Sequence, residues 1–277
     1  LYITPVAYKK PAFSFLTKSQ WICFGCTAIL HLKSMIDNNQ KHNTMTQVLS
    51  NVSAKKTGRI GGVLYLIIII SGLFSEMFVR SSLIVPGDAA TTVNNIMNSE
   101  GLFRIGFVSD LIMVMCDVGV ALIFYVLLKP VNKGLALLAA FFRLAQATII
   151  GLNLLNYFAV VLLLGDAEYL SAYTTGQLQA NVMFFLNLHS YGYLISGVFF
   201  GMSCMVLSWL FCKSPRFPKF LGFMLLLASL GYLTDCLTNF LAPQYADVSE
   251  LLLLPTAVVT ELTLCIWLLV KGAKSIK

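Results

Sequence analysis

The chain has 277 residues, of which 58% are hydrophobic and only 11% charged, whereas a soluble domain is usually about half apolar and a quarter charged. This composition excludes an ordinary soluble fold and indicates that lipid surrounds most of the chain. The net charge of +7 does not predict a nucleic-acid partner, because the basic residues are divided among several connections and do not form one patch.

Residues 1–44 differ from the rest of the chain. Their apolar segment Trp21–Leu32 contains about a dozen residues, which is too short to cross a bilayer. Met45 follows as a plausible start. We predict that residues 1–44 are upstream or added sequence, either disordered or lying at the membrane interface, and that residues 45–277 form a single membrane domain. The alternative is an amphipathic interfacial anchor.

Six apolar runs follow, each close to the roughly 20 residues that a helix needs to cross a hydrocarbon core of about 30 Å. They are Ile60–Phe78, Arg104–Leu128, Gly134–Leu164, Val182–Cys212, Phe220–Leu241 and Leu251–Val270. The sequence therefore predicts an all-α fold, an integral membrane helical bundle with six transmembrane helices. The third and fourth runs exceed the required length, which predicts that they tilt or project beyond the bilayer.

The charged residues between the runs predict the orientation of the bundle. Basic residues gather before the first run, in the second and fourth connections and after the last run: Lys55, Lys56, Arg59, Lys129, Lys133, Lys213, Arg216, Lys219, Lys271, Lys274 and Lys277. The opposite connections are mainly acidic, with Arg80 and Arg104 at their edges. Because cytoplasmic loops are enriched in Lys and Arg, we expect both termini in the cytoplasm and a multi-pass protein of the inner (cytoplasmic) cell membrane.

Prolines and glycines indicate how the spans connect and pack. Pro130, Pro215 and Pro218 predict tight turns, so that spans two and three, and spans four and five, form antiparallel hairpins. The connection of residues 79–103 predicts a lid or a short surface helix. Ser249 and Pro255 predict the start of the last span. The GxxxG pairs Gly58/Gly62 and Gly197/Gly201 predict close contacts between helices.

Two ionisable residues in the second and third runs are expected to form a pair. Counted from Val131 in the turn, Asp117 lies fourteen residues back and Arg143 twelve residues forward. Antiparallel helices place these positions at nearly one depth, close to the middle of the bilayer. A guanidinium group can bind a carboxylate through two hydrogen bonds, and Gln146 lies one turn further along. We interpret Asp117 and Arg143 as a structural ion pair.

A second group of ionisable residues is expected in the outer half of the bundle. Asp110, His189 and Asp235 each lie about two helical turns from the outer end of a run, and Glu76 approaches the same level. Together they predict an outward-facing polar pocket that binds protons, a cation or a small polar solute. The His189, Asp110 and Asp235 side chains are also weak candidates for metal ligands. The alternative is a set of structural hydrogen bonds around a neutral histidine.

The charge balance favours a functional role for these groups. Five carboxylates lie within the runs and face one arginine, Arg143, which leaves a sum of −4 with His189 neutral. Such a sum is unfavourable at low dielectric, so some acids must hold protons or a cation must lie among them. Glu261 has no obvious partner in the sequence and is therefore a further candidate for the binding site.

Several separated motifs resemble an uncharacterised bacterial membrane family, the domain of unknown function 4386. They are Leu127–Lys133, Phe141–Leu144, His189 with Phe199–Gly201, Leu221–Gly222, Gly231–Asp235, and Glu261 with Trp267–Gly272. The resemblance extends from about Lys55 to Lys274. It implies six spans and a bacterial cytoplasmic membrane, but no activity.

We expect the membrane protein to act through the outward-facing pocket, as a transporter of protons, a cation or a small polar solute, and without a cofactor. The first alternative is an intramembrane enzyme acting on a lipid or isoprenoid, with His189 and Asp235 as acid and base. The second is a non-catalytic membrane partner or stress-response subunit. The lipid bilayer is the expected surrounding, and a homo-oligomer is possible in any of these cases.

Overall fold

The computed structural model describes residues 54–273, in which all regular structure is helical. The predictions for residues 1–44 therefore lie outside the described residues. Six helical segments are long and apolar enough to cross a membrane, which confirms the helical fold class and the number of candidate spans. Their bounds are Ala54–Leu83, Glu100–Leu128, Lys133–Leu163, Thr175–Lys213, Lys219–Leu241 and Pro243–Val270.

The first segment is longer than the sequence predicted. It consists of α3 (Ala54–Leu73), the π-helical η1 (Phe74–Arg80) and the short α4 (Ser81–Leu83). The prediction that it ends at Phe78 is wrong, because the backbone stays helical through Leu83. The π-helix has a wider turn than an α-helix, and such turns are frequent at functional sites.

The connection between the first two spans contains the predicted short helix, α5 (Ala89–Asn98). Asp88 caps it, accepting hydrogen bonds from the Thr91 backbone N–H at 2.9 Å and the Thr91 hydroxyl at 2.7 Å. These hydrogen bonds lower the pKa of Asp88, first through the backbone contact. The prediction of a surface helix in this connection is confirmed.

The two predicted hairpins are also confirmed. The first joins α6 (Glu100–Leu128) to α7 (Lys133–Leu163), with the Asn132 side chain accepting a hydrogen bond from Leu135 N–H at 3.0 Å. After the 3₁₀ turn η2 (Glu168–Ala172), the second joins α8 (Thr175–Lys213) to α9 (Lys219–Leu241). A capping box of Thr174 and Gln177 begins α8, seven residues before the run that the sequence indicated.

The last segment consists of the 3₁₀ turn η3 (Pro243–Tyr245) and α10 (Ala246–Val270). The prediction that Ser249 and Pro255 begin this helix is wrong. Pro255 lies inside α10, and Ser249 donates a hydrogen bond to Asp235. The preceding turn η3 starts the helix earlier than the apolar run suggested.

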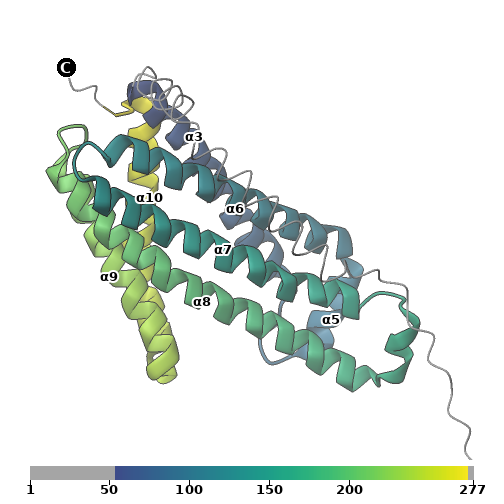
Figure 1. Cartoon of the computed structure of the whole chain (residues 1–277). Helices are drawn as coiled ribbons and strands as arrows, with labels where there is room; N and C mark the ends of the chain where they lie inside the picture. The colour runs from purple at the N-terminus through teal and green to yellow at the C-terminus, as the bar shows by residue number, and fades with distance from the viewer. Residues whose placement is uncertain (1–53, 274–277) are drawn as a thin grey trace, which may run out of the picture. The chain divides into compact units, whose positions relative to one another are not determined.

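Glycines bring α3 against α10, as the GxxxG pattern predicted. Gly58 lies against the backbone of Gly272 and Ala273, and Gly62 lies against Leu268 and Leu269. Gly272 has a φ of +65° and accepts this conformation because it lacks a Cβ. The start of the first span and the end of the last therefore lie at one end of the bundle. Away from that end, α9 and α10 lean apart from α3, α6 and α7 (Figure 1).

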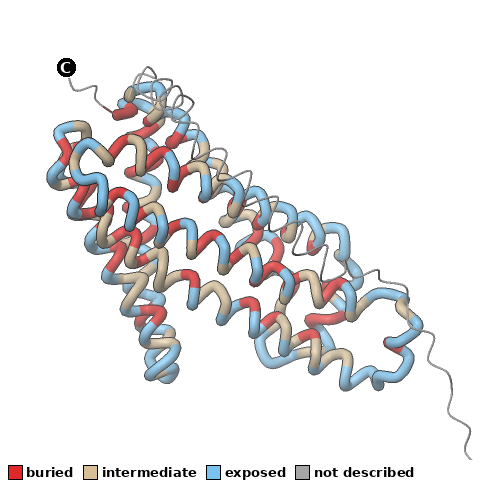
Figure 2. Tube along the Cα trace, viewed as in Figure 1, coloured by how far each residue is buried: buried red, intermediate tan, exposed pale blue. Residues whose placement is uncertain are grey.

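The pattern of burial matches a helical bundle surrounded by lipid. Buried residues follow the inner faces of the helices, whereas the outer faces are exposed along their whole length (Figure 2). Many of these exposed side chains are large and apolar, such as Leu155 at 68% and Leu251 at 72% exposure. Exposing so many large apolar side chains is unfavourable in water but favourable in the hydrocarbon of a bilayer.

Candidate functional site: a polar cleft among the spans

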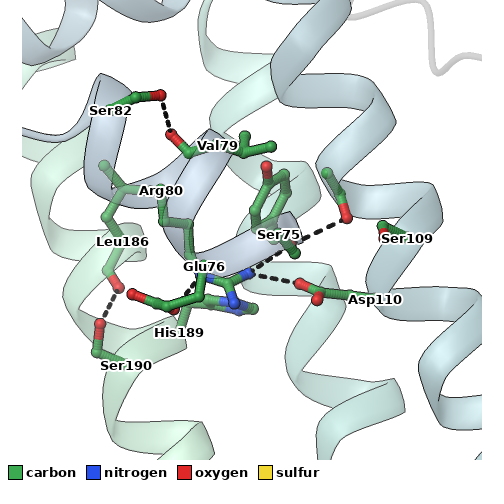
Figure 3. Close-up of polar contacts among 12 residues, drawn as sticks. Ser75, Glu76, Val79, Arg80, Ser82, Ser109, Asp110, Leu186, His189 and Ser190 are labelled. Carbon is green, nitrogen blue, oxygen red and sulfur yellow. Dashed lines mark hydrogen bonds and ion pairs between the residues drawn. The ribbon is translucent and has the colours of Figure 1, made fainter. Parts of the chain in front are cut away.

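The Arg80 guanidinium group forms hydrogen bonds with polar side chains of the first and second spans. It donates to Asp110 Oδ2 from Nη1 at 2.6 Å and to Glu76 Oε2 from Nε at 2.8 Å. Nη1 also donates to the Ser75 hydroxyl at 2.8 Å. Figure 3 shows the guanidinium group between these three side chains, with His189 beside it. Asp110 is fully buried, whereas the Glu76 side chain is 60% exposed.

This cluster corrects the charge balance that was inferred from the sequence. Arg80 was expected at the edge of a connection, but it belongs to η1 and its side chain is only 11% exposed. Five carboxylates therefore face two guanidinium groups, Arg80 and Arg143, and the sum is −3 and not −4. The four-residue spacing of Glu76 and Arg80 was a signal in the sequence that would have found this pair.

His189 is buried at the crossing of α7 and α8. Its Nδ1 lies 3.3 Å from the Asn153 carbonyl oxygen, and Asn153 Nδ2 donates to the His189 carbonyl at 2.7 Å. The rings of Tyr157 and Tyr193 meet the imidazole edge to face. Nε2 is buried and has no hydrogen-bond partner within the described residues. The contact with Asn153 therefore favours a proton on Nδ1 and leaves Nε2 as a proton acceptor.

Asp117 and Arg143 lie in contact between α6 and α7. Arg143 Nη2 donates to Asp117 Oδ1 at 2.5 Å, and Gln146 Nε2 donates to Oδ2 at 3.1 Å. Both charged side chains are 3% exposed. The guanidinium group also lies over the rings of Tyr65 and Phe200, at 5.4 and 5.1 Å from their centroids. Arg143 Nε and Gln146 Oε1 remain buried without partners among residues 54–273.

The two remaining acids have neutral partners. Glu261 accepts a hydrogen bond from the Tyr232 hydroxyl at 2.5 Å, so the expectation that it lacks a partner is wrong. Asp235 accepts one from the Ser249 hydroxyl at 2.7 Å and a longer one from Asn239 at 3.3 Å. In the part of the chain that the structure describes, no salt bridge reaches either carboxylate. Sequence reasoning missed Tyr232, because nothing predicted which faces of α9 and α10 meet.

Two adjoining hollows connect these groups. The first, the central cavity, has a volume of about 290 Å³, and its polar lining includes Asp117, Arg143, Gln146, Tyr232, Asp235 and Glu261. The second, the acidic cleft, has a volume of about 800 Å³, and its polar lining includes Glu76, Arg80, His189, Tyr193, Asp235, Glu250 and Glu261. Because Asp235, Tyr232 and Glu261 line both, the hollows form one polar region.

The cleft brings together most, but not all, of the predicted site residues. His189, Asp235, Glu76 and Glu261 line it, whereas Asp110 is not in the lining and is hydrogen-bonded to Arg80, which is. The weak metal hypothesis for His189, Asp110 and Asp235 is not supported. Within residues 54–273, no three His, Cys, Asp or Glu side chains converge as metal ligands.

The fold and this polar region define a helical protein with six membrane-span-like segments around a charged interior. The chain belongs to the family described as Domain of unknown function (DUF4386), whose profile matches residues 60–272. It is 30% identical over 163 residues to an uncharacterized protein of Archaeoglobus fulgidus, covering 59% of this chain and 81% of the relative. No solved structure matches the chain. The family resemblance predicted from the motifs is thus confirmed.

Proposed function

We propose that this chain is a multi-pass membrane protein that binds a small cationic or polar solute, protons included, in the acidic cleft. Both termini would lie in the cytoplasm and the cleft would face outward. The basic residues support this orientation, since they gather at the end where α3 meets α10. Glu76 and Glu250 line the cleft far from that end along their own helices.

The excess of acids in the polar region is the observation on which the proposal depends. Arg80 and Arg143 are already occupied by Asp110, Glu76 and Asp117. In the part of the chain from residue 54 to residue 273, Asp235 and Glu261 have only hydroxyl and amide partners. A carboxylate inside a membrane requires a counter-charge or a proton. A solute that carries positive charge satisfies both acids when it enters the cleft.

The unpartnered polar atoms of the central cavity support the same function. Gln146 Oε1 and Arg143 Nε are buried without partners among the described residues, and both residues line this cavity. Buried polar atoms are normally hydrogen-bonded, and an exception calls for an explanation. A solute with both hydrogen-bond donors and acceptors can supply the missing contacts.

The contacts favour this proposal over an intramembrane enzyme with His189 and Asp235 as acid and base. Within the described residues, His189 contacts Asn153, and Asp235 contacts Ser249 and Asn239. No hydrogen bond connects the two proposed catalytic groups there. The hypothesis of a non-catalytic membrane partner or subunit stays a prediction.

The proposal is tested with purified protein in liposomes, using two probes: proton entry reported by pyranine, and uptake of radiolabelled methylammonium. Wild-type protein should raise at least one of these rates above that of protein-free liposomes. Glu261→Gln should lower that rate by about tenfold, which corresponds to about 1.4 kcal/mol in binding. The matched control is Glu100→Gln, whose carboxylate pairs with Arg104 away from the cleft. Equal rates for wild-type protein and protein-free liposomes, with both probes, would refute transport through the cleft.

A further inference from the structure

We infer that the ligand of the acidic cleft is an amphiphile, with a cationic head among the acids and an alkyl tail that leaves the cleft sideways into the bilayer. This inference rests on the proposed function and narrows its solute to one chemical class. Three features support it: a gap between two spans, an apolar rim along that gap, and the negative charge of the cleft lining.

The gap lies between the first and last spans. At one end of the bundle these helices touch, with Arg59 donating to the Val270 carbonyl at 3.3 Å and Cys265 Sγ lying 3.6 Å from the Gly62 carbonyl oxygen. Further along, residues of η1 and of α10 both line the acidic cleft. Figure 1 shows α10, together with α9, leaning away from α3, α6 and α7 in this direction. The cleft is thus bordered by two helices that diverge.

The rim of the cleft on α10 is apolar and faces outward. Leu254 and Val258 line the cleft, yet they are 51% and 46% exposed. They are four residues apart and therefore lie on one face of the helix. Their depth in a predicted span places this face beside hydrocarbon. An alkyl tail lying over Leu254 and Val258 would contact the cleft and the bilayer at once.

The charges that line the cleft indicate the charge of the ligand's head group. Four acids, Glu76, Asp235, Glu250 and Glu261, face one arginine, Arg80, which Asp110 also neutralises from behind. The surplus is negative and favours a cationic head over an anionic one. The ring of Tyr232 lies in the same lining, and aromatic faces attract quaternary ammonium groups, whereas the Tyr193 ring already has the Arg80 guanidinium group 5.3 Å from its centroid.

The size of the cleft fits such a ligand. Its volume of about 800 Å³ lies within the range of about 300–1,000 Å³ that is typical of sites for small organic ligands. A proton or a single metal ion needs far less room. An alkylammonium head with the first part of its tail uses both the acidic and the apolar lining.

The test uses photo-crosslinking in lipid nanodiscs. The probe is dodecyltrimethylammonium with a diazirine in the tail, and its control is the same tail with a sulfate head. We expect the ammonium probe to label peptides that contain Leu254 and Val258, and Glu261→Gln to reduce that labelling about tenfold. The sulfate probe should label these peptides no more than other lipid-facing segments.

Leu254→Trp should narrow the rim and reduce labelling by the ammonium probe. Leu251→Trp, at a position that is 72% exposed and outside the cleft lining, should not reduce it.

A further measurement separates this inference from the proposed function. Binding of tetramethylammonium, which has the head but no tail, is measured by radioligand filtration on wild type and Glu261→Gln. If it binds through Glu261 while the two tailed probes label identically, the amphiphile inference is overturned and solute binding stands. If tetramethylammonium does not bind and the tailed probes label identically, the amphiphile inference and the binding of an organic cation are both overturned, and the pyranine assay decides whether the cleft handles protons. Selective labelling by the ammonium probe supports both.

Discussion

The ion pair of Asp117 and Arg143 allows a quantitative prediction about stability. Asp117→Asn removes one charge and leaves Arg143 buried at 3% exposure without a counter-ion. Breaking a buried pair in this way typically costs about 3–5 kcal/mol. A hydrogen bond between membrane helices contributes only about 0.6 kcal/mol on average. Gln146→Leu removes just such a bond, of 3.1 Å, so its effect should be several times smaller than that of Asp117→Asn.

The measurement is the free energy of unfolding by steric trapping in lipid bicelles. Asp117→Leu combined with Arg143→Met removes both charges and should destabilise the protein less than Asp117→Asn alone, because no unpaired charge remains. Glu100→Gln breaks a pair whose side chains are 51% and 56% exposed, and it should change stability by about 0.3–0.5 kcal/mol. If Asp117→Asn costs no more than Gln146→Leu, the carboxylate carries no buried charge and the electrostatic reasoning is refuted.

Three further predictions concern packing, capping and orientation. Gly62→Ala places a methyl group against the backbone of α10 and should destabilise the bundle by about 1–3 kcal/mol in the same unfolding assay, whereas Gly101→Ala, which meets no atom within 4 Å, should not. Asp88 has a lowered pKa because of the hydrogen bonds it accepts at the start of α5, so its cap stabilises this helix above the unfolded pKa of about 4 and is lost as the pH falls through the folded value. The protection factors of the α5 amides, which correct the exchange rates for their intrinsic slowing in acid, should therefore fall with the pH, and wild-type protection factors that stay constant would contradict this cause. In intact cells, a membrane-impermeant maleimide should label Asn98→Cys but not Lys219→Cys, and the reverse result would overturn the proposed orientation.

Counting residues along a hairpin was enough to identify one contact from the sequence alone. Pro130 limits the turn to a few residues, so Asp117 and Arg143 had to lie at similar depth on adjacent helices. The distance of 2.5 Å between Arg143 Nη2 and Asp117 Oδ1 in the structure follows from that local constraint. Counting from the turn gives the relative depth of two residues because the two helices of the hairpin are consecutive in the chain and antiparallel.

The partners of Arg80 and Glu261 illustrate the limit of such counting. The sequence places Arg80 at the edge of a connection, while the π-helical turn of η1 keeps it inside the helix and beside Asp110. Glu261 meets Tyr232 only because α9 and α10 turn particular faces to each other. Hydropathy reports which residues enter the bilayer, but it does not report how each helix is rotated.

The sequence by itself determined the helical class, the six candidate spans, the turns and the family, because each depends on local composition or on motifs along the chain. Only the tertiary structure decided which carboxylates bind a guanidinium group and which accept a hydrogen bond from a hydroxyl group. It also decided that α10 separates from the first span, which leaves room for the acidic cleft. Those outcomes depend on the rotation and tilt of helices, which are set by side-chain packing between segments distant in sequence.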